Sequence, residues 1–116
     1  MNSKSLIKLL MDSHNKVEFG AIQKLVNMTL KYLLLLNQFD DEFEKQGFIV
    51  DINNCDCPLD SIILSALEKD EVAKASGVKW TTITPNEYND IQAEISKLLI
   101  NKYNTSGNIR YDFIKY

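Results

Sequence analysis

The chain has little glycine, proline or cysteine, and these shortages argue against several classes of protein. Of its 116 residues only four are glycine and two are proline. The glycines, at positions 20, 47, 77 and 107, are isolated from one another, so the sequence has no glycine-rich loop of the kind that holds nucleotide phosphates. ATP, GTP and dinucleotide chemistry are therefore disfavoured, and we expect no cofactor.

Residues for metal or thiol chemistry are equally scarce. Cys55 and Cys57 are separated by one residue, whereas zinc-binding pairs usually enclose about two to four. His14 is the only histidine. A metal-thiol enzyme built on these three residues is one alternative, but we expect free thiols, no metal site and no enzyme. Free thiols fit a reducing compartment, so we expect a cytoplasmic protein.

Long apolar runs and arginine are also lacking. A membrane-spanning helix needs roughly 20 apolar residues, and the strongest patch, Leu33 to Leu36, is far shorter. The segment from Met1 to Met11 has no small-residue cleavage site, so we expect neither a secretory signal nor a membrane partner. Arg110 is the only arginine among thirteen basic residues. Because base recognition favours the arginine fork, this scarcity counts against sequence-specific nucleic-acid binding.

Charge is unevenly distributed along the acidic chain, whose net charge is -3. Residues 1 to 37 carry a net charge of +3, whereas residues 38 to 76 carry -7. Complementary fields of this kind could orient the protein against a partner or a copy of itself, although ordinary solvated surface is the simpler interpretation.

The most informative stretch is Phe19 to Asn37, which is apolar around most of a helix. Gln23, Asn27 and Lys31 recur every four residues, so their side chains form one line along the helix. This line could face solvent, lie in a groove and bind a partner's backbone, carboxylate or phosphate, or form an internal hydrogen-bond network. We expect Gln23, Asn27 and Lys31 to bind a partner.

Similar patterns predict the other elements. Ser3 or Ser5 would cap a helix ending near Ser13, and Asn15 with Glu18 would start the central helix near Lys16. A short acidic helix is expected over 40 to 46, and a third main helix from Pro58 towards Gly77. Thr84, Pro85 and Glu87 specify the start of a helix that runs to about Tyr103.

The remaining segments favour extended structure. Residues 48 to 52 and 78 to 84 are rich in strand-forming residues, and Ile109, Tyr111 and Phe113 alternate along a tail over 108 to 116. The sequence thus predicts one mainly α domain over residues 1 to 116, a bundle of about four main helices with a minor short strand pair.

Three segments, QKLVNMTLKYL at 23 to 33, CPLDSIIL at 57 to 64 and YDFIKY at 111 to 116, resemble a small family of uncharacterised bacterial helical proteins. The resemblance spans most of the chain in scattered blocks and brings no activity. It implies that the polar line and the tail belong to one recurring architecture, in a bacterial or phage protein.

Together these patterns favour a non-enzymatic interaction protein: an adaptor, inhibitor or assembly subunit that binds another protein and could form homo-oligomers. The alternative is a nucleic-acid-associated module that uses the basic first third of the chain, where the lysines are Lys4, Lys8, Lys16, Lys24 and Lys31.

Overall fold

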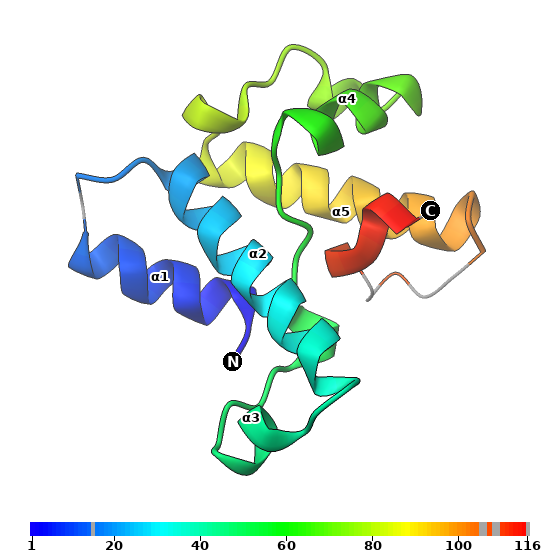
Figure 1. Ribbon diagram of the computed structural model, residues 1–116. Coiled ribbons are helices and arrows are strands. Elements are labelled where there is room, and N and C mark those ends of the chain that lie inside the picture. The colour runs from blue at the N-terminus through cyan, green and yellow to red at the C-terminus, as the bar shows by residue number, and fades with distance from the viewer. Residues whose placement is uncertain (15, 105–106, 108–109, 116) are drawn as a thin grey trace.

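The computed structural model describes residues 1–14, 16–104, 107 and 110–115, and these residues form a mainly helical fold without a strand (Figure 1). The α-helices are α1 (Ser3–Ser13), α2 (Phe19–Asn37), α3 (Glu42–Lys45), α4 (Ser61–Lys69) and α5 (Pro85–Asn101). Short 3-10 turns are η1 (Ile52–Asn54), η2 (Ala73–Ala75), η3 (Trp80–Thr82) and η4 (Arg110–Lys115). The mainly α prediction with four long helices is confirmed.

The start of α5 follows local sequence rules closely. The hydroxyl of Thr84 accepts the Glu87 N–H at 3.2 Å, and the Glu87 carboxylate accepts the Thr84 N–H at 3.0 Å. This reciprocal capping box, with Pro85 in the first helical position, is the one that the sequence predicts.

Two other helix starts differ from their predictions. Helix α1 is capped by Asn2, whose side chain accepts the Ser5 N–H, because the Ser3 side chain is buried and bonds elsewhere. Helix α4 begins at Ser61, after the Asp60 cap, and not near Pro58, which lies in a buried extended segment.

The start of α2 also differs. Helix α2 begins at Phe19, with Glu18 at the N-cap position and no side-chain capping bond. Asn15, half of the predicted capping box, lies outside the described residues.

The predicted strand pair is wrong for the described part of the chain. Within 78 to 84 the backbone turns at η3, which packs against α2, and 48 to 52 leads into η1. The tail turns at η4 and buries Tyr111 and Phe113, whereas Ile109 lies outside the described residues. Residues 48 to 52 bond instead to the backbone of Met1, and no strand forms among the residues that the structure describes.

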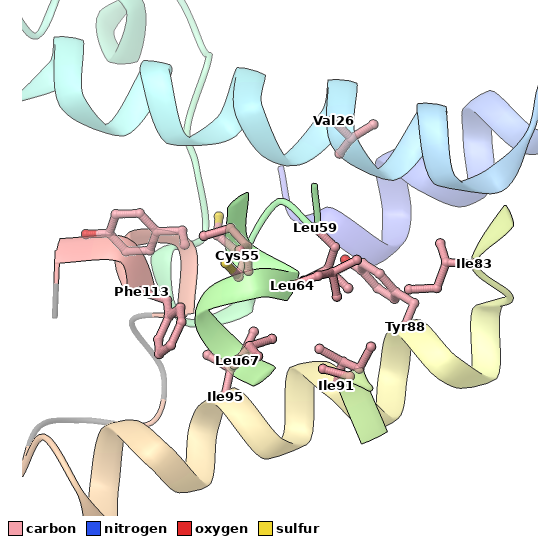
Figure 2. Packing of buried hydrophobic residues seen from close by; sticks show 14 of the residues in the cluster. Val26, Cys55, Leu59, Leu64, Leu67, Ile83, Tyr88, Ile91, Ile95 and Phe113 are labelled. Carbon is pink, nitrogen blue, oxygen red and sulfur yellow. The ribbon is translucent and has the colours of Figure 1, made fainter. Parts of the chain in front are cut away.

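The hydrophobic core lies between α2 and α5. Leu59, Leu64 and Leu67 fill the space between Val26 on α2 and Ile91 on α5 (Figure 2). Leu59, Leu67 and Ile91 have no exposed surface. Burying each such side chain contributes on the order of 2 kcal/mol, so this layer is a major source of stability.

A buried extended segment, residues 55 to 59, crosses the core just before α4. Gln23 of α2 and Gln92 of α5 both bond to its backbone, which places the segment between these two helices. At the opposite end of α2, residues 38 to 49 are all exposed, and α3 projects there from the main body (Figure 1). After this projection the chain returns to the main body beside the amino terminus, where the Met1 amino group donates to the Ile49 carbonyl at 2.8 Å.

Candidate functional site

The polar line of α2 points into the protein over most of its length. Gln23 and Asn27 are 0% exposed, and Lys31 is half-buried. The internal hydrogen-bond network is therefore the correct interpretation for the two amides, and the solvent-facing and groove interpretations are wrong for them. Gln23 and Asn27 have no free surface with which to contact a partner directly.

Gln23 and Gln92 hold the backbone of the buried segment. Gln23 accepts the Leu59 N–H at 3.1 Å and donates to the Leu59 carbonyl at 2.6 Å. Gln92 makes the same pair of bonds with Cys57, at 2.9 and 2.7 Å. Because buried peptide groups need partners, each glutamine replaces the neighbouring strand that this extended segment lacks. Gln23 thus binds the backbone of its own chain.

Asn27 lies at the centre of a second set of buried bonds. Its amide donates to the Tyr88 hydroxyl at 2.9 Å and to the Gln23 oxygen at 3.3 Å. Its oxygen accepts the Ser3 hydroxyl at 2.6 Å, and that hydroxyl accepts the Asp56 N–H at 2.7 Å. One side chain of α2 therefore joins α1, α5 and the buried segment.

Asp56 is the charged centre of this network. Its carboxylate accepts the Tyr88 hydroxyl at 2.5 Å and forms an ion pair with Arg110 at 2.8 Å. Arg110 also donates to the Gly107 carbonyl and to the Ser96 hydroxyl, both at 3.3 Å. The buried charge is thus paired, and the pair fastens the C-terminal turn η4 to the core.

Burial makes the neighbouring acidic groups poor proton donors. Desolvation, reinforced by Asp56 and Asp51, raises the pKa of the Cys55 thiol to about 11. Complete burial also raises the pKa of Cys57, and burial beside the Asp56 carboxylate raises the pKa of Tyr88. Reactive thiols need the opposite, a lowered pKa and access to solvent. This cluster has the features of a structural network.

No metal site is found within the described part of the chain, where no group of three or more His, Cys, Asp or Glu side chains is suitably placed. His14, which the metal-thiol alternative requires, is exposed at the end of α1, whereas both thiols are buried. The structure therefore does not bring His14, Cys55 and Cys57 together. Across the same residues, no helix is long and apolar enough to cross a membrane.

The opposite face of α2 carries apolar side chains that are exposed. Leu25, Tyr32, Leu36 and Phe39 are 61%, 55%, 49% and 88% exposed, and Met28 between them is half-buried. With spacings of three and four residues, these five side chains form one row, here called the α2 stripe. Helix α2 thus buries two amides beside its core residues Ile22, Val26 and Leu30, and on its outer face it exposes hydrocarbon where a common surface helix carries polar residues.

The two ends of the α2 stripe differ in shape. At the Leu25 end, an open hollow of about 320 Å³ is lined by Ala21, Lys24, Leu25, Met28 and Trp80. The Lys24 ammonium lies 4.7 Å from the centre of the Trp80 ring, a cation–π contact that holds both side chains at the hollow. At the other end, Phe39 projects into solvent and is the most exposed large apolar side chain in the part of the chain that the structure describes.

The two ends also differ in charge. Asp40, Asp41, Glu42 and Glu44 follow Phe39 and are all exposed, with Lys45 as the one basic residue among them. Lys16 and Lys24 lie near the beginning of α2, together with Glu18. The polarity seen in the sequence is therefore a physical property of the stripe, basic at its start and strongly acidic at its end.

The lysines of the nucleic-acid alternative differ in their surroundings. Lys4, Lys8 and Lys16 are exposed, Lys24 lies over Trp80, and Lys31 is half-buried and close enough to Cys57 to lower its pKa against the effect of burial.

Comparison of the chain with protein-family models, with curated proteins and with solved structures finds no match. The assignment of a function therefore depends on the geometry of the molecule itself.

Sequence reasoning missed several members of the buried network, namely Ser3, Asp56, Tyr88, Gln92 and Arg110. One signal was available: Asp56 is a lone acid within Cys55 to Leu59, a stretch otherwise free of charge. A carboxylate among such neighbours needs a buried cationic or hydroxyl partner.

Proposed function

We propose that this chain is a non-enzymatic interaction protein, an adaptor, inhibitor or assembly subunit, that binds another protein through the α2 stripe. The observation that carries this proposal is the apolar outer face of α2, where Leu25, Tyr32, Leu36 and Phe39 are exposed in one row. Exposed apolar patches that are contiguous and have a charged rim are typical of protein–protein interfaces.

The arrangement of α2 supports this function. The helix is fixed in its rotation by the buried bonds of Gln23 and Asn27, so the stripe is presented on a rigid element. Rigid presentation reduces the entropy lost on binding. Rows with spacings of three and four residues are also the pattern by which one helix packs against another.

The role proposed for the three residues of the polar line changes accordingly. Gln23 and Asn27 orient the binding helix from inside, and Lys31 can reach solvent beside the stripe. The acidic residues that follow Phe39 form the rim of the surface. We therefore expect surface variants to alter binding without unfolding the protein, and Gln23 or Asn27 variants to alter both.

The test is affinity capture from the protein's own cells with two matched variants. Leu25→Lys places a charge on the stripe, and Ile62→Lys places the same charge at an α4 residue that is 67% exposed, close to the 61% of Leu25. A partner recovered by the wild type and identified by mass spectrometry should bind the purified wild type and Ile62→Lys equally. Leu25→Lys should bind it at least ~30-fold more weakly, since the loss of an apolar anchor in a pocket costs about 2 kcal/mol or more.

Three outcomes would contradict the proposal. The first is loss of binding in both variants, and the second is retention in both. The third is catalytic turnover that copurifies with the folded chain. Binding of nucleic acid that weakens steeply with salt would favour the alternative function instead.

A further inference from the structure

We infer that the protein that occupies the α2 stripe is a second copy of this chain, with the two α2 helices packed antiparallel about a two-fold axis near Tyr32. This inference rests on the proposed function, because it names the occupant of the same surface.

Charge complementarity is the first reason. The stripe has a basic residue, Lys24, at its beginning and four acids, residues 40, 41, 42 and 44, after its end. A partner of uniform charge would match one end and be repelled by the other. A second copy placed antiparallel matches both ends, whereas a parallel copy would bring the two acidic ends together.

The geometry of the row is the second reason. Tyr32 is the midpoint, with Met28 and Leu36 four residues to either side and Leu25 and Phe39 seven residues to either side. Phe39 lies in the turn that follows α2, and this turn stays close to the helix end because the Phe39 and Asp40 N–H groups both donate to the Leu36 carbonyl, at 3.0 and 2.9 Å. At 1.5 Å per residue the row is about 21 Å long, so antiparallel copies can overlap over its whole length.

Shape complementarity is the third reason. In the antiparallel arrangement, Phe39 of one copy approaches the Leu25 end of the other, where the hollow beside Trp80 opens. An exposed aromatic ring at one end and an apolar hollow at the other are the two halves of a self-complementary contact. Asp40 then arrives close to Lys24, which already lies at the edge of that hollow.

A two-fold contact of this kind has a definite consequence. The α2 stripe of each copy is covered by the α2 stripe of the other, so the assembly closes as a dimer and does not grow into a fibre. Any further partner would have to bind outside the α2 stripe or compete with the second copy.

The experiment begins with the mass of the purified 116-residue chain, measured by sedimentation equilibrium over a wide range of concentration. We expect twice the 13.3 kDa of one chain, with the monomer appearing on dilution. Tyr32→Lys places two like charges at the axis and should weaken the dimer by about 100-fold or more, whereas Ile62→Lys should leave it unchanged.

Disulfide cross-linking then tests the orientation. Both native cysteines are buried, so an introduced thiol is the accessible one. A mixture of Leu25→Cys and Phe39→Cys chains should cross-link to each other, because antiparallel packing brings these positions together, and each variant alone should cross-link poorly. Efficient self-linking of either variant alone would overturn the antiparallel arrangement.

A charge exchange tests the contact between the ends. Lys24→Glu and Asp40→Lys should each weaken the dimer by about tenfold, because the pair occurs twice in the assembly. The double variant should restore most of the affinity, whereas additive losses would overturn the pairing of these ends.

Failure of the inference is distinguishable from failure of the proposed function. A chain that stays monomeric but binds a different protein in a way that Leu25→Lys abolishes overturns the dimer and supports the function. A dimer that Tyr32→Lys leaves intact also overturns the inference. A monomer without any stripe-dependent partner overturns both.

Discussion

The buried ion pair between Asp56 and Arg110 allows the sharpest prediction about the core. The Asp56 carboxylate is 5% exposed and the Arg110 side chain 17% exposed, and their closest atoms are 2.8 Å apart. Arg110→Gln removes the cation, and among the described side chains the Tyr88 hydroxyl remains as the native donor to the buried carboxylate. Breaking a buried pair in this way costs about 3 to 5 kcal/mol.

We expect the loss of stability to lie at the lower end of this range. Solvent reaches the partly exposed Arg110 side, so water can take over some of the lost contacts with the carboxylate. Arg110→Gln should therefore lower the free energy of unfolding by about 3 kcal/mol and the Tm by roughly 10 °C. Urea denaturation followed by circular dichroism and by the fluorescence of Trp80, the single tryptophan, measures this change.

A double-mutant cycle separates the pair from other effects. Asp56→Asn removes the negative charge but keeps an oxygen that can accept the Tyr88 hydroxyl. The double variant Asp56→Asn with Arg110→Gln should lose less stability than the sum of the single variants, with a coupling energy of about 2 kcal/mol. A coupling below ~0.5 kcal/mol would refute the reasoning, because it would mean that the two charges are solvated and that Arg110 does not anchor the tail.

Three further predictions concern other parts of the fold. Gly20→Ala should lower the free energy of unfolding, measured in urea, by about 1 to 3 kcal/mol, because a Cβ there would lie 1.8 Å from the Trp80 carbonyl oxygen. An unchanged free energy of unfolding would contradict the close packing of η3 on α2. Cys55 and Cys57 should react with a thiol reagent at least ~100-fold faster in urea than in the folded protein, because burial raises both pKa values. Equal rates would show that the segment of residues 55 to 59 is open to solvent in the folded protein. Hydrogen bonds from Lys102 and Tyr103 lower the pKa of Asp70, so their stabilisation is fully present above the ordinary carboxyl pKa and is lost as pH falls through the folded-state value. Asp70→Asn should make the free energy of unfolding depend less on pH in this acid range. An identical pH dependence in wild type and variant would contradict the role of Asp70.

The helices were predictable where their signals are local. The start of α5 depends on Thr84, Pro85 and Glu87, which lie within four consecutive residues, and the structure matches the prediction. The predicted start of α4 near Pro58 was wrong because proline also suits an extended segment. The bonds that hold this segment come from Gln23 and Gln92, both more than thirty residues away in the sequence.

The orientation of α2 was not predictable from its periodicity. The usual rule places polar residues towards water, but Asn27 bonds Tyr88, 61 residues away, and Gln23 bonds Leu59, 36 residues away. Such distant partners leave no trace in the spacing of the helix itself. A chemical signal did exist: uncharged amides can be buried at modest cost when they are bonded, whereas the charge of Lys31 keeps it near the edge.

The central claim is that α2 presents its amides inwards and its apolar stripe outwards. The most direct test compares the unfolding free energies of Asn27→Leu and Tyr32→Gln, measured in urea at a protein concentration low enough for the chain to be monomeric. Asn27→Leu should lose about 3 kcal/mol or more, because the buried Ser3 hydroxyl loses its acceptor and the Tyr88 and Gln23 oxygens each lose a donor, whereas Tyr32→Gln should stay within about 0.5 kcal/mol of the wild type. The reverse pattern, with a stable Asn27→Leu and a strongly destabilised Tyr32→Gln, would contradict this orientation of the helix.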